Sequence, residues 1–370
     1  MDAGIFFFWL SVSSGIALIL SEFVLACIPP KKNHPDKNTP AQYPAFTVIV
    51  AARNEEKNLP LLLSSLQKLD YPEYSILIAL DRCSDNSKNI VLQFMENNPC
   101  LSFLEFQNKT PDGWSPKKYV LNESIHQAKT EWLAFTDADC EVPPDWLKSF
   151  ALHTNKETDI ILGTGPYLKH PGILNAFIRY ETARTAFLYL QSAHLGLPYM
   201  GVGRSLAYRK KFFLSKEGFQ GFQEILSGDD DLLISHKSEG KHCRTATESP
   251  VFSHPPRTLS QWISQKIRHL SSAKQYPLRR AILPLWLNLC HGIFYLSLGF
   301  TAISGTFALA SGLVLLVRWI TGPLFLYWRA RSLAFKDIQL TYFVMDILLL
   351  LYHLFLLPLS LFRKAKWKED

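Results

Sequence analysis

The 370-residue chain lacks the short signatures of several common enzyme classes. It has no GxxxxGK(S/T) sequence, which excludes P-loop phosphate chemistry, and neither GxSxG nor HExxH occurs. Its two Gly-x-Gly pairs, at 163–165 and 201–203, lack the third glycine of a dinucleotide-binding fingerprint. The six cysteines form no CxxC pair, so a zinc site is not expected, and their scatter favours reduced thiols over a disulfide framework.

The basic residues do not form a dense block with interleaved aromatic residues in the middle of the chain, so no nucleic-acid partner is expected. Lys and Arg together number 39 against 32 Asp and Glu, which gives a formal net charge of +7. The basic clusters lie beside long apolar runs, at Lys31-Lys32, Arg279-Arg280 and Arg363 to Lys368. This placement indicates a membrane surface as the partner of the positive charge.

The first apolar run covers residues 5–28 and has Glu22 as its only charge. It is long enough to cross a membrane. No basic residue precedes Ile5, and the run is too long for the core of a signal peptide, so we expect a retained anchor rather than a cleaved leader. Lys31-Lys32 then predicts that everything after residue 31 lies in the cytosol.

The C-terminal quarter of the chain is apolar again. Residues 282–327 contain one charge, Arg318, and have room for two connected spans; a last run covers 338–362 and ends in a basic tail. Three full spans would leave this tail outside, against the positive-inside rule. Either one segment is re-entrant or interfacial, or the rule fails here. The predicted division is a transmembrane anchor at 1–30, a linker at 31–44, a cytosolic domain at 45–276, and a membrane region with two to three apolar segments at 277–370.

The middle of the chain alternates between strand and helix patterns. Apolar, β-rich runs predict strands at 46–52, 74–80, 101–106 and 132–136, and helical patterns lie between them. Such alternation predicts an α/β fold with a mostly parallel sheet. Ligands of such sheets bind beyond the carboxyl ends of the strands. Polar clusters follow three of these strands directly, at 53–56, 81–85 and 137–139.

Three acidic features have the residue types that metal and proton chemistry require. Asp137 and Asp139 follow a strand and offer the oxygen ligands that Mg²⁺ or Mn²⁺ prefers, although a polar turn gives the same pattern. Asp81 suits a base or ribose hydroxyl, and the alternative is an Asx turn. The run 229–231 brings together three like charges, which raises the pKa of one member and suits a general base; the alternative is an acidic helix start.

A predicted helix at 262–273 is the basic counterpart of these acids. Its periodicity places Gln265, Arg268 and His269 on one face. An arginine beside a diphosphate would neutralise the charge of a leaving group. The alternative is an amphipathic helix that lies on the membrane surface.

In chain order, these segments resemble the motifs of glycosyltransferase family 2, whose members have the GT-A fold. Residues 50–56 resemble the strand and loop that hold the nucleotide, and Asp137-Ala138-Asp139 resembles the DxD metal motif. The resemblance covers about 46–276 and implies a nucleotide-sugar-binding α/β domain beside N- and C-terminal transmembrane helices. It implies that Asp139 and Asp137 hold Mg²⁺ or Mn²⁺, and that the donor contacts Ala52, Arg53, Asn54, Glu55, Asp81, Lys117 and Asp137.

The later motifs of the resemblance concern catalysis and the acceptor. Residues 203–209 resemble GxNxAxR with Ser205 at the asparagine position, and 265–269 resemble QxxRW with His269 at the tryptophan position. The pair 229–230 resembles the ED motif whose second acid is the general base, and a shift of one position would make the first acid the base instead. The implied catalytic residues are Asp230, Asp229, Arg268 and Gln265, and the implied acceptor-side residues are Gly203, Arg204, Ser205 and His269.

The function implied is that of an inverting hexosyltransferase that uses a nucleotide-diphosphate sugar. Because the domain is tethered to a membrane, we expect a lipid or lipid-linked acceptor at the cytosolic face, in a bacterial inner membrane. One alternative is a polysaccharide synthase that adds many sugars. An alternative from another class is a membrane scaffold with a degenerate, sugar-binding domain, although the intact acids argue against decay.

Overall fold

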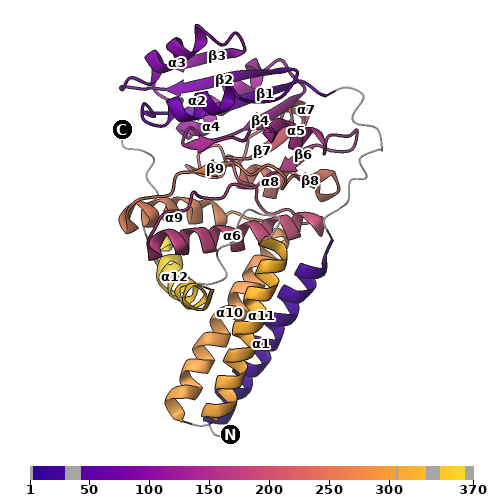
Figure 1. The fold of residues 1–370 in the computed structure, drawn as a ribbon, viewed down its shortest axis with the longest axis vertical. Helices are drawn as coiled ribbons and strands as arrows, with labels where there is room; N and C mark the ends of the chain where they lie inside the picture. Colours follow the sequence, from indigo (N-terminus) through magenta and orange to yellow (C-terminus); the bar gives the residue numbers. More distant parts are fainter. Residues whose placement is uncertain (1–2, 30–42, 306, 331–341, 363–370) are drawn as a thin grey trace.

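The computed structural model describes residues 3–29, 43–305, 307–330 and 342–362. The predicted linker lies largely outside these ranges, as do Lys31-Lys32 and the basic tail after 362. A seven-stranded sheet forms the upper part of the molecule (Figure 1), with the strand order β3-β2-β1-β4-β7-β6-β8. Its strands are β1 (Phe46–Ala52), β2 (Tyr74–Asp81), β3 (Leu101–Phe106), β4 (Trp132–Phe135), β6 (Ile160–Leu162), β7 (Leu206–Arg209) and β8 (Cys243–Thr245).

The sheet is mostly parallel, as the sequence predicts. β1 pairs in parallel with β2 and β4, and β2 with β3, whereas β7 runs antiparallel to β4 and β6. A separate ribbon pairs β5 (Cys140–Glu141) with β9 (Phe252–Ser253). The helices of this part are α2 (Leu59–Leu66), α3 (Ser87–Met95), α4 (Pro116–Gln127), α5 (Trp146–Ala151), α6 (Ile173–His194), α7 (Lys210–Ser215), α8 (Asp231–Lys237), η1 (Gly240–His242) and α9 (Leu259–Ala273).

The central strands are buried on both faces. In β1, Phe46, Val48, Ile49 and Val50 are all inaccessible to solvent, which explains their continuous apolar run. One face of the sheet packs against α2 and α5, and the other against α4 and part of α6. The predicted strands and helices of this region are all present, with ends that differ by at most a few residues.

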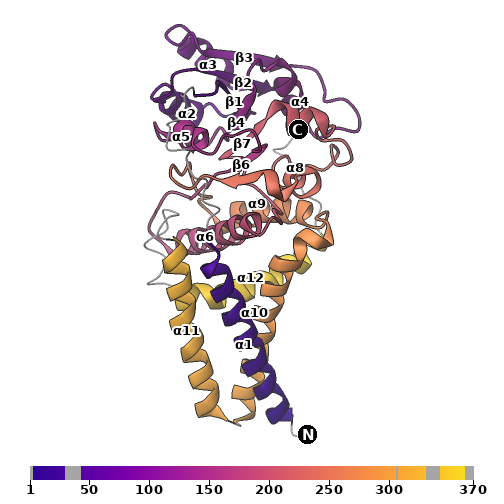
Figure 2. The same ribbon diagram turned by 90° about the vertical axis from the view of Figure 1, so that its right-hand side faces the viewer.

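Four helices in the described residues are long and apolar enough to cross a membrane: α1 (Ala3–Cys27), α10 (Leu278–Ser304), α11 (Ala308–Ala330) and α12 (Tyr342–Phe362). The two connected spans expected at 282–327 are α10 and α11. Figures 1 and 2 show α1, α10 and α11 side by side in one elongated bundle below the sheet. Large apolar side chains, such as those of Trp9, Ile303 and Leu309, point outward from this bundle, as expected beside lipid.

The fourth apolar helix, α12, is not aligned with the bundle. In Figures 1 and 2 it lies across the top of the bundle, beneath α6 and α9. The ring of Tyr352 lies 5.6 Å from that of Trp262 in α9 and 6.2 Å from that of Phe177 in α6. This arrangement favours an interfacial segment among the alternatives for the last apolar run. Helices α6, α9 and α12 thus form a layer between the sheet and the bundle.

Candidate active site

The loops after β1 and β2 meet at the carboxyl edge of the sheet. Asn54 and Arg82 both adopt left-handed backbone conformations, at φ 53° and 47°, which turn the chain sharply after each strand. The Asn54 side-chain oxygen accepts a hydrogen bond from the Ser84 amide at 2.9 Å. Asp81, at the end of β2, is buried and pairs with Arg82 at 2.8 Å. The two loops therefore form one polar wall.

Four other predicted donor residues belong to this wall or border it. Arg53 and Glu55 directly follow β1, and the Glu55 amide donates to the Ser87 hydroxyl at 2.9 Å. Ala52 is the last residue of β1, and its carbonyl accepts from the Cys83 thiol at 3.5 Å. Lys117 lies in the first turn of α4, and its ammonium contacts Asp137, which follows β4.

The candidate metal ligands follow β4. One ligand atom from each of Asp137, Asp139 and Cys140 lies within 4.8 Å of the others. Burial raises the pKa of the Cys140 thiol well above its ordinary value, and this thiol donates to Asp139 at 3.7 Å. The two carboxylates are therefore the ligands suited to a hard divalent cation.

The pKa values of the two carboxylates move in opposite directions. Burial raises the pKa of Asp137, but the charges of Lys117, Arg204 and Arg268 outweigh it and hold this pKa below its usual value. Burial, and then the charge of Asp137, raise the pKa of Asp139. The ionised pair repels itself in a site of low dielectric constant, and a bound cation would relieve this repulsion. The residues present therefore fit Mg²⁺ or Mn²⁺.

Lys117 joins the segment of the candidate metal ligands to the acidic run. Its ammonium lies 3.1 Å from Asp137 Oδ1 and 2.8 Å from Asp229 Oδ2. Burial lowers the pKa of Lys117, but these two carboxylates and that of Asp230 outweigh it and raise the pKa, so the lysine stays charged. These residues line one cavity, together with Gly203; it contains about 340 Å³ of unfilled space, counting the part that opens to the outside. The structure thus brings together residues more than 100 positions apart in sequence, all of which the sequence selects.

The three adjacent acids have separate partners. Asp229 pairs with Lys117, whereas Asp231 accepts hydrogen bonds from Ser272 at 2.8 Å and Tyr276 at 2.6 Å. Asp230 caps α8 and accepts from the backbone amides of Asp231 and Gly203. The run therefore begins a helix, as one alternative predicts, and its first two acids also line the cavity; the role of general base stays a prediction.

Asp230 has the electrostatics expected of a proton acceptor. Burial raises its pKa to about 8, with further contributions from the charges of Asp229 and Asp231. The carboxylate closely approaches the backbone at Gly203, where a Cβ would lie 3.2 Å from Asp230 Oδ2 and would crowd this side chain. This carboxyl group lies in the same cavity as Lys117 and Asp137.

Tyr167 organises the basic side of the site, and no sequence motif indicates it. The Arg204 guanidinium lies 4.3 Å from the centre of its ring and donates to its hydroxyl at 3.2 Å. Gln265 donates to the same hydroxyl at 3.1 Å. Arg204 Nη1 and Gln265 Oε1 are buried without a hydrogen-bond partner in the described part of the chain. A buried donor and a buried acceptor without partners could form hydrogen bonds with an anionic, hydroxylated ligand.

The predicted face of α9 does point toward the site. Arg268 is close enough to Asp137 to lower its pKa. Burial, followed by the charges of Lys266 and Arg268, lowers the pKa of His269 well below its ordinary value, so this imidazole is neutral. The membrane-surface alternative for α9 also has support, because its other side packs on α12.

Ser205 does not face the cavity. It is fully buried, and its hydroxyl accepts a hydrogen bond from the Trp146 indole at 3.2 Å. Its contacts therefore support the backbone of the 203–209 segment, and none of them supports a role on the acceptor side.

Lys118 is a second residue with a structural role that no sequence motif indicates. Its buried ammonium donates to the carbonyls of Phe222, Ile225 and Ser227 at 3.0, 2.6 and 2.7 Å, and burial lowers its pKa to about 8. These bonds fix the loop that leads into the acidic run.

The fold and the acidic site together define a GT-A transferase. The model "Glycosyl transferase family 2" matches residues 47–212, and "Glycosyl transferase family group 2" matches 132–362. The second match covers more than half of the chain. The chain therefore belongs to glycosyltransferase family 2.

Individual relatives match over shorter stretches. The chain is 31% identical over 109 residues to poly-β-1,6-N-acetyl-D-glucosamine synthase of Staphylococcus epidermidis, covering 30% of this chain and 25% of that one. It is 27% identical over 135 residues to β-monoglucosyldiacylglycerol synthase of Trichormus variabilis, covering 36% and 28%. The matched part thus spans about a quarter of each relative.

A solved structure resembles the whole chain. The mannosyltransferase PcManGT from Pyrobaculum calidifontis, in complex with GDP-Man and Mn²⁺, superposes with a TM-score of 0.58 at 15% identity. The similarity covers 95% of this chain and 98% of that one. At this identity the likeness establishes the fold, and the GT-A prediction is confirmed.

Proposed function

We propose that this protein transfers a hexosyl group from a nucleotide-diphosphate sugar to a hydroxyl group of a lipid or lipid-linked acceptor, with inversion at the anomeric carbon. One observation carries the proposal: Lys117 links Asp137 of the DxD segment to the Asp229-Asp230 pair across a single cavity. A metal-binding pair and a carboxyl group of raised pKa at such close range fit donor activation and proton removal.

The donor end of this cavity is built to hold a diphosphate. Asp139 and Asp137 would hold Mg²⁺ or Mn²⁺, which when bound supplies positive charge to the diphosphate oxygens. Arg268, Arg204 and Gln265 lie on the same side and stabilise the negative charge that develops on the leaving nucleotide diphosphate. The loops that contain Asn54 and Asp81 hold the nucleoside.

Asp230 is the proposed general base. As the acceptor oxygen forms a bond to the anomeric carbon, its proton passes to the Asp230 carboxylate. The bond between the anomeric carbon and the diphosphate oxygen breaks, and its electron pair leaves with the nucleotide. A single displacement of this kind inverts the configuration. The backbone amides of Gly203 and Asp231 orient the carboxylate for this step.

The membrane region supports a lipid acceptor and a cytosolic site. We place 1–30 as the anchor, 45–276 as the catalytic domain and 277–370 as the membrane region. With α1, α10 and α11 as the spans and α12 in the interface, the chain has returned to the side of the catalytic domain by the end of α12, which agrees with the positive-inside rule for a sequence that continues with basic residues. We therefore propose a donor site in the cytosol, at a bacterial inner membrane. The name of the Trichormus relative includes a diacylglycerol product, which agrees with a lipid acceptor.

A polysaccharide synthase is the second candidate. The Staphylococcus relative, whose name is that of a polymer-forming synthase, favours it. Product length separates the candidates, since a single-addition enzyme yields one product size at all reaction times, whereas a synthase yields a rising distribution.

Donor binding tests the proposal at its first step. The protein in detergent is screened with uridine and guanosine sugars by thermal shift, with Mn²⁺ or with EDTA. We expect stabilisation by one donor that requires metal and is lost in Asp139→Ala. The absence of any stabilisation of a folded protein would contradict the proposal and support the scaffold alternative.

A further inference from the structure

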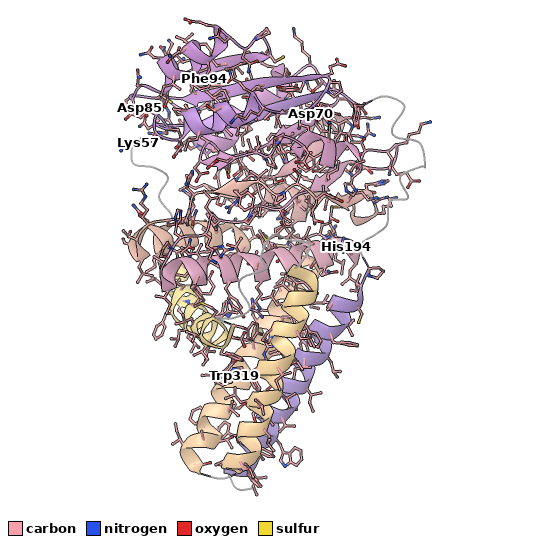
Figure 3. The ribbon with its side chains drawn as sticks, in the orientation of Figure 1. Lys57, Asp70, Asp85, Phe94, His194 and Trp319 are labelled. Atoms are coloured by element: carbon pink, nitrogen blue, oxygen red, sulfur yellow. The ribbon has the colours of Figure 1, made fainter. Side chains whose placement is uncertain are left out.

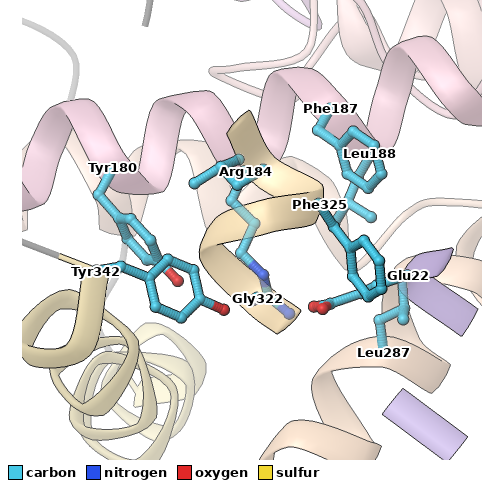
Figure 4. Close-up of a pocket in the computed structure, with 10 residues that line it drawn as sticks. Glu22, Tyr180, Arg184, Phe187, Leu188, Leu287, Gly322, Phe325 and Tyr342 are labelled. Atoms are coloured by element: carbon cyan, nitrogen blue, oxygen red, sulfur yellow. The ribbon is translucent and has the colours of Figure 1, made fainter. Parts of the chain in front are cut away.

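A second pocket lies on the opposite side of α6 from the active site, where this helix crosses the membrane bundle. Figure 4 shows Arg184 reaching from α6 into this pocket, toward Gly322 of α11 and Glu22 of α1. It contains about 410 Å³ of unfilled space, counting the part that opens to the outside. It shares no lining residue with the active-site cavity.

The carboxylates around this pocket already have partners. The Arg318 guanidinium binds Glu22 and lies 3.3 Å from Asp346. Asp346 also accepts hydrogen bonds from Tyr180 at 2.8 Å and Tyr295 at 2.6 Å. This network ties α1, α6, α10, α11 and α12 together. It pairs Arg318 with both carboxylates, and within the described residues neither carboxylate forms a hydrogen bond or ion pair with Arg184.

Arg184 is not neutralised by the described residues. Its Nη1 donates to the Asn288 amide oxygen at 3.2 Å, and its Nη2 is buried without a hydrogen-bond partner in the described ranges. An ionised guanidinium beside hydrocarbon is costly unless an anion pairs with it. The carboxylate in the lining, Glu22, pairs with Arg318, and most of the other lining residues are apolar, among them Phe187 and Phe325. Such a pocket beside Arg184 fits a group that is anionic at one end and apolar at the other.

The depth of the pocket matches the head-group region of a bilayer. Glu22 lies five residues before the end of α1, which is about 7 Å of helix at 1.5 Å per residue. The in-plane helices α6 and α12 provide the roof and one wall. Phosphate oxygens at this level accept paired hydrogen bonds from a guanidinium.

We propose that this pocket binds the phosphate group of a membrane lipid, with Arg184 as its anion ligand. The acyl or isoprenoid chain extends from the pocket along the apolar outer surface of the bundle. Two sources share this chemistry: a phospholipid of the bilayer, and the phosphate of a lipid-linked substrate. The proposal does not depend on sugar transfer, because it concerns a site separate from the donor cavity.

The test is lipid binding to the full-length protein in a neutral detergent, measured by native mass spectrometry. Phosphatidic acid is compared with the diacylglycerol that has the same chains, so that only the phosphate differs. We expect preferential binding of phosphatidic acid, weakened about tenfold or more in Arg184→Gln, which is the scale for a lost charge-assisted hydrogen bond. Arg184→Lys keeps the charge and should retain most of the preference.

The matched control is Arg279→Gln, which removes an exposed positive charge at the start of α10, outside the pocket. Binding unchanged in this control and lost in Arg184→Gln supports the site. Equal weakening in both variants would show attraction to the general surface charge and overturn the proposal. So would equal binding of the two lipids to the unaltered protein, a result that remains decisive if Arg184→Gln does not fold.

Steady-state kinetics distinguish the two lipid sources. If the phosphate belongs to the acceptor, Arg184→Gln raises KM for the lipid acceptor and leaves kcat and donor binding unchanged. If it belongs to a bilayer phospholipid, KM is unchanged and only the stabilisation by phosphatidic acid is lost.

Discussion

Replacement of Asp230 by asparagine separates the chemistry of the site from its architecture. In the native site, the two carboxylate oxygens of Asp230 accept from different backbone amides, those of Asp231 and Gly203. Asparagine has one side-chain oxygen, so its amide group would face one of these N–H groups. An unsatisfied buried donor costs about 1–3 kcal/mol. The substitution also removes a carboxylate whose ionised form is disfavoured by burial and by the charges of Asp229 and Asp231. Its removal stabilises the fold and offsets the cost of the unsatisfied donor.

The net effect of Asp230→Asn on folding is therefore small, and its effect on catalysis is large. We expect a change in the free energy of unfolding of no more than about 2 kcal/mol, and a fall in turnover of about 10²–10⁴-fold, the range for loss of a general base. Donor affinity should stay within a few-fold, because the proposed metal ligands are Asp137 and Asp139.

The assay combines turnover with donor calorimetry, and Asp231→Asn is the matched control. Asp231 lies next in sequence but accepts hydrogen bonds from Ser272 and Tyr276 and does not line the cavity. We expect this control to keep turnover within a few-fold. Full turnover in Asp230→Asn would refute the assignment of the base. Loss of donor binding in the same variant would show that Asp230 acts in binding.

Three further predictions concern the pH profile, the loop before the acids and the basic side of the site. Because the base works when deprotonated and burial raises the pKa of Asp230 to about 8, kcat/KM should rise with pH through about 8. Asp229→Asn should move this rise to lower pH by removing a like charge, and an unchanged or upward-shifted rise would contradict the reasoning. Lys118→Met leaves three carbonyls without their donor, so we expect the free energy of unfolding, measured by chemical denaturation, to fall by about 2–5 kcal/mol. The control Lys88→Met removes an exposed ion pair and should lower it by less than about 1 kcal/mol. Tyr167→Phe keeps the ring beside Arg204 but removes the hydroxyl that accepts hydrogen bonds from Arg204 and Gln265. We expect the Kd of the donor to rise about 5- to 20-fold. An unchanged Kd would show that these side chains lie outside the donor site.

The central strands and the order of the site motifs were predictable from sequence. Strands β1, β2 and β4 are buried on both faces for most of their length, and a strand in this position has a continuous apolar run between polar turns. The acids at 137, 139 and 230 could be selected from the sequence because charged residues next to such apolar runs usually have a structural or functional role. The structure adds the link through Lys117, whose contacts lie 20 and 112 positions away in sequence.

Other features of the fold and the site have no pattern in the sequence from which they could be predicted. Strands β5 and β9 have two residues each, too few for any periodicity, yet their pairing places the ribbon next to the DxD segment. Tyr167 meets Gln265 98 positions away, a contact that no local signal reports. The orientation of α12 was also open, because an in-plane helix and a spanning helix can share the same apolar composition. Packing against Trp262 and Phe177 decides its position.

The stereochemistry of the product tests the central claim most directly. The protein is incubated with the donor found by thermal shift, Mn²⁺ and a membrane lipid extract, and the glycosidic linkage of the product is determined by NMR. The account predicts transfer to a lipid with an inverted anomeric configuration, abolished by EDTA and in Asp230→Asn. Transfer with retained configuration, or transfer that persists in Asp230→Asn, would contradict it.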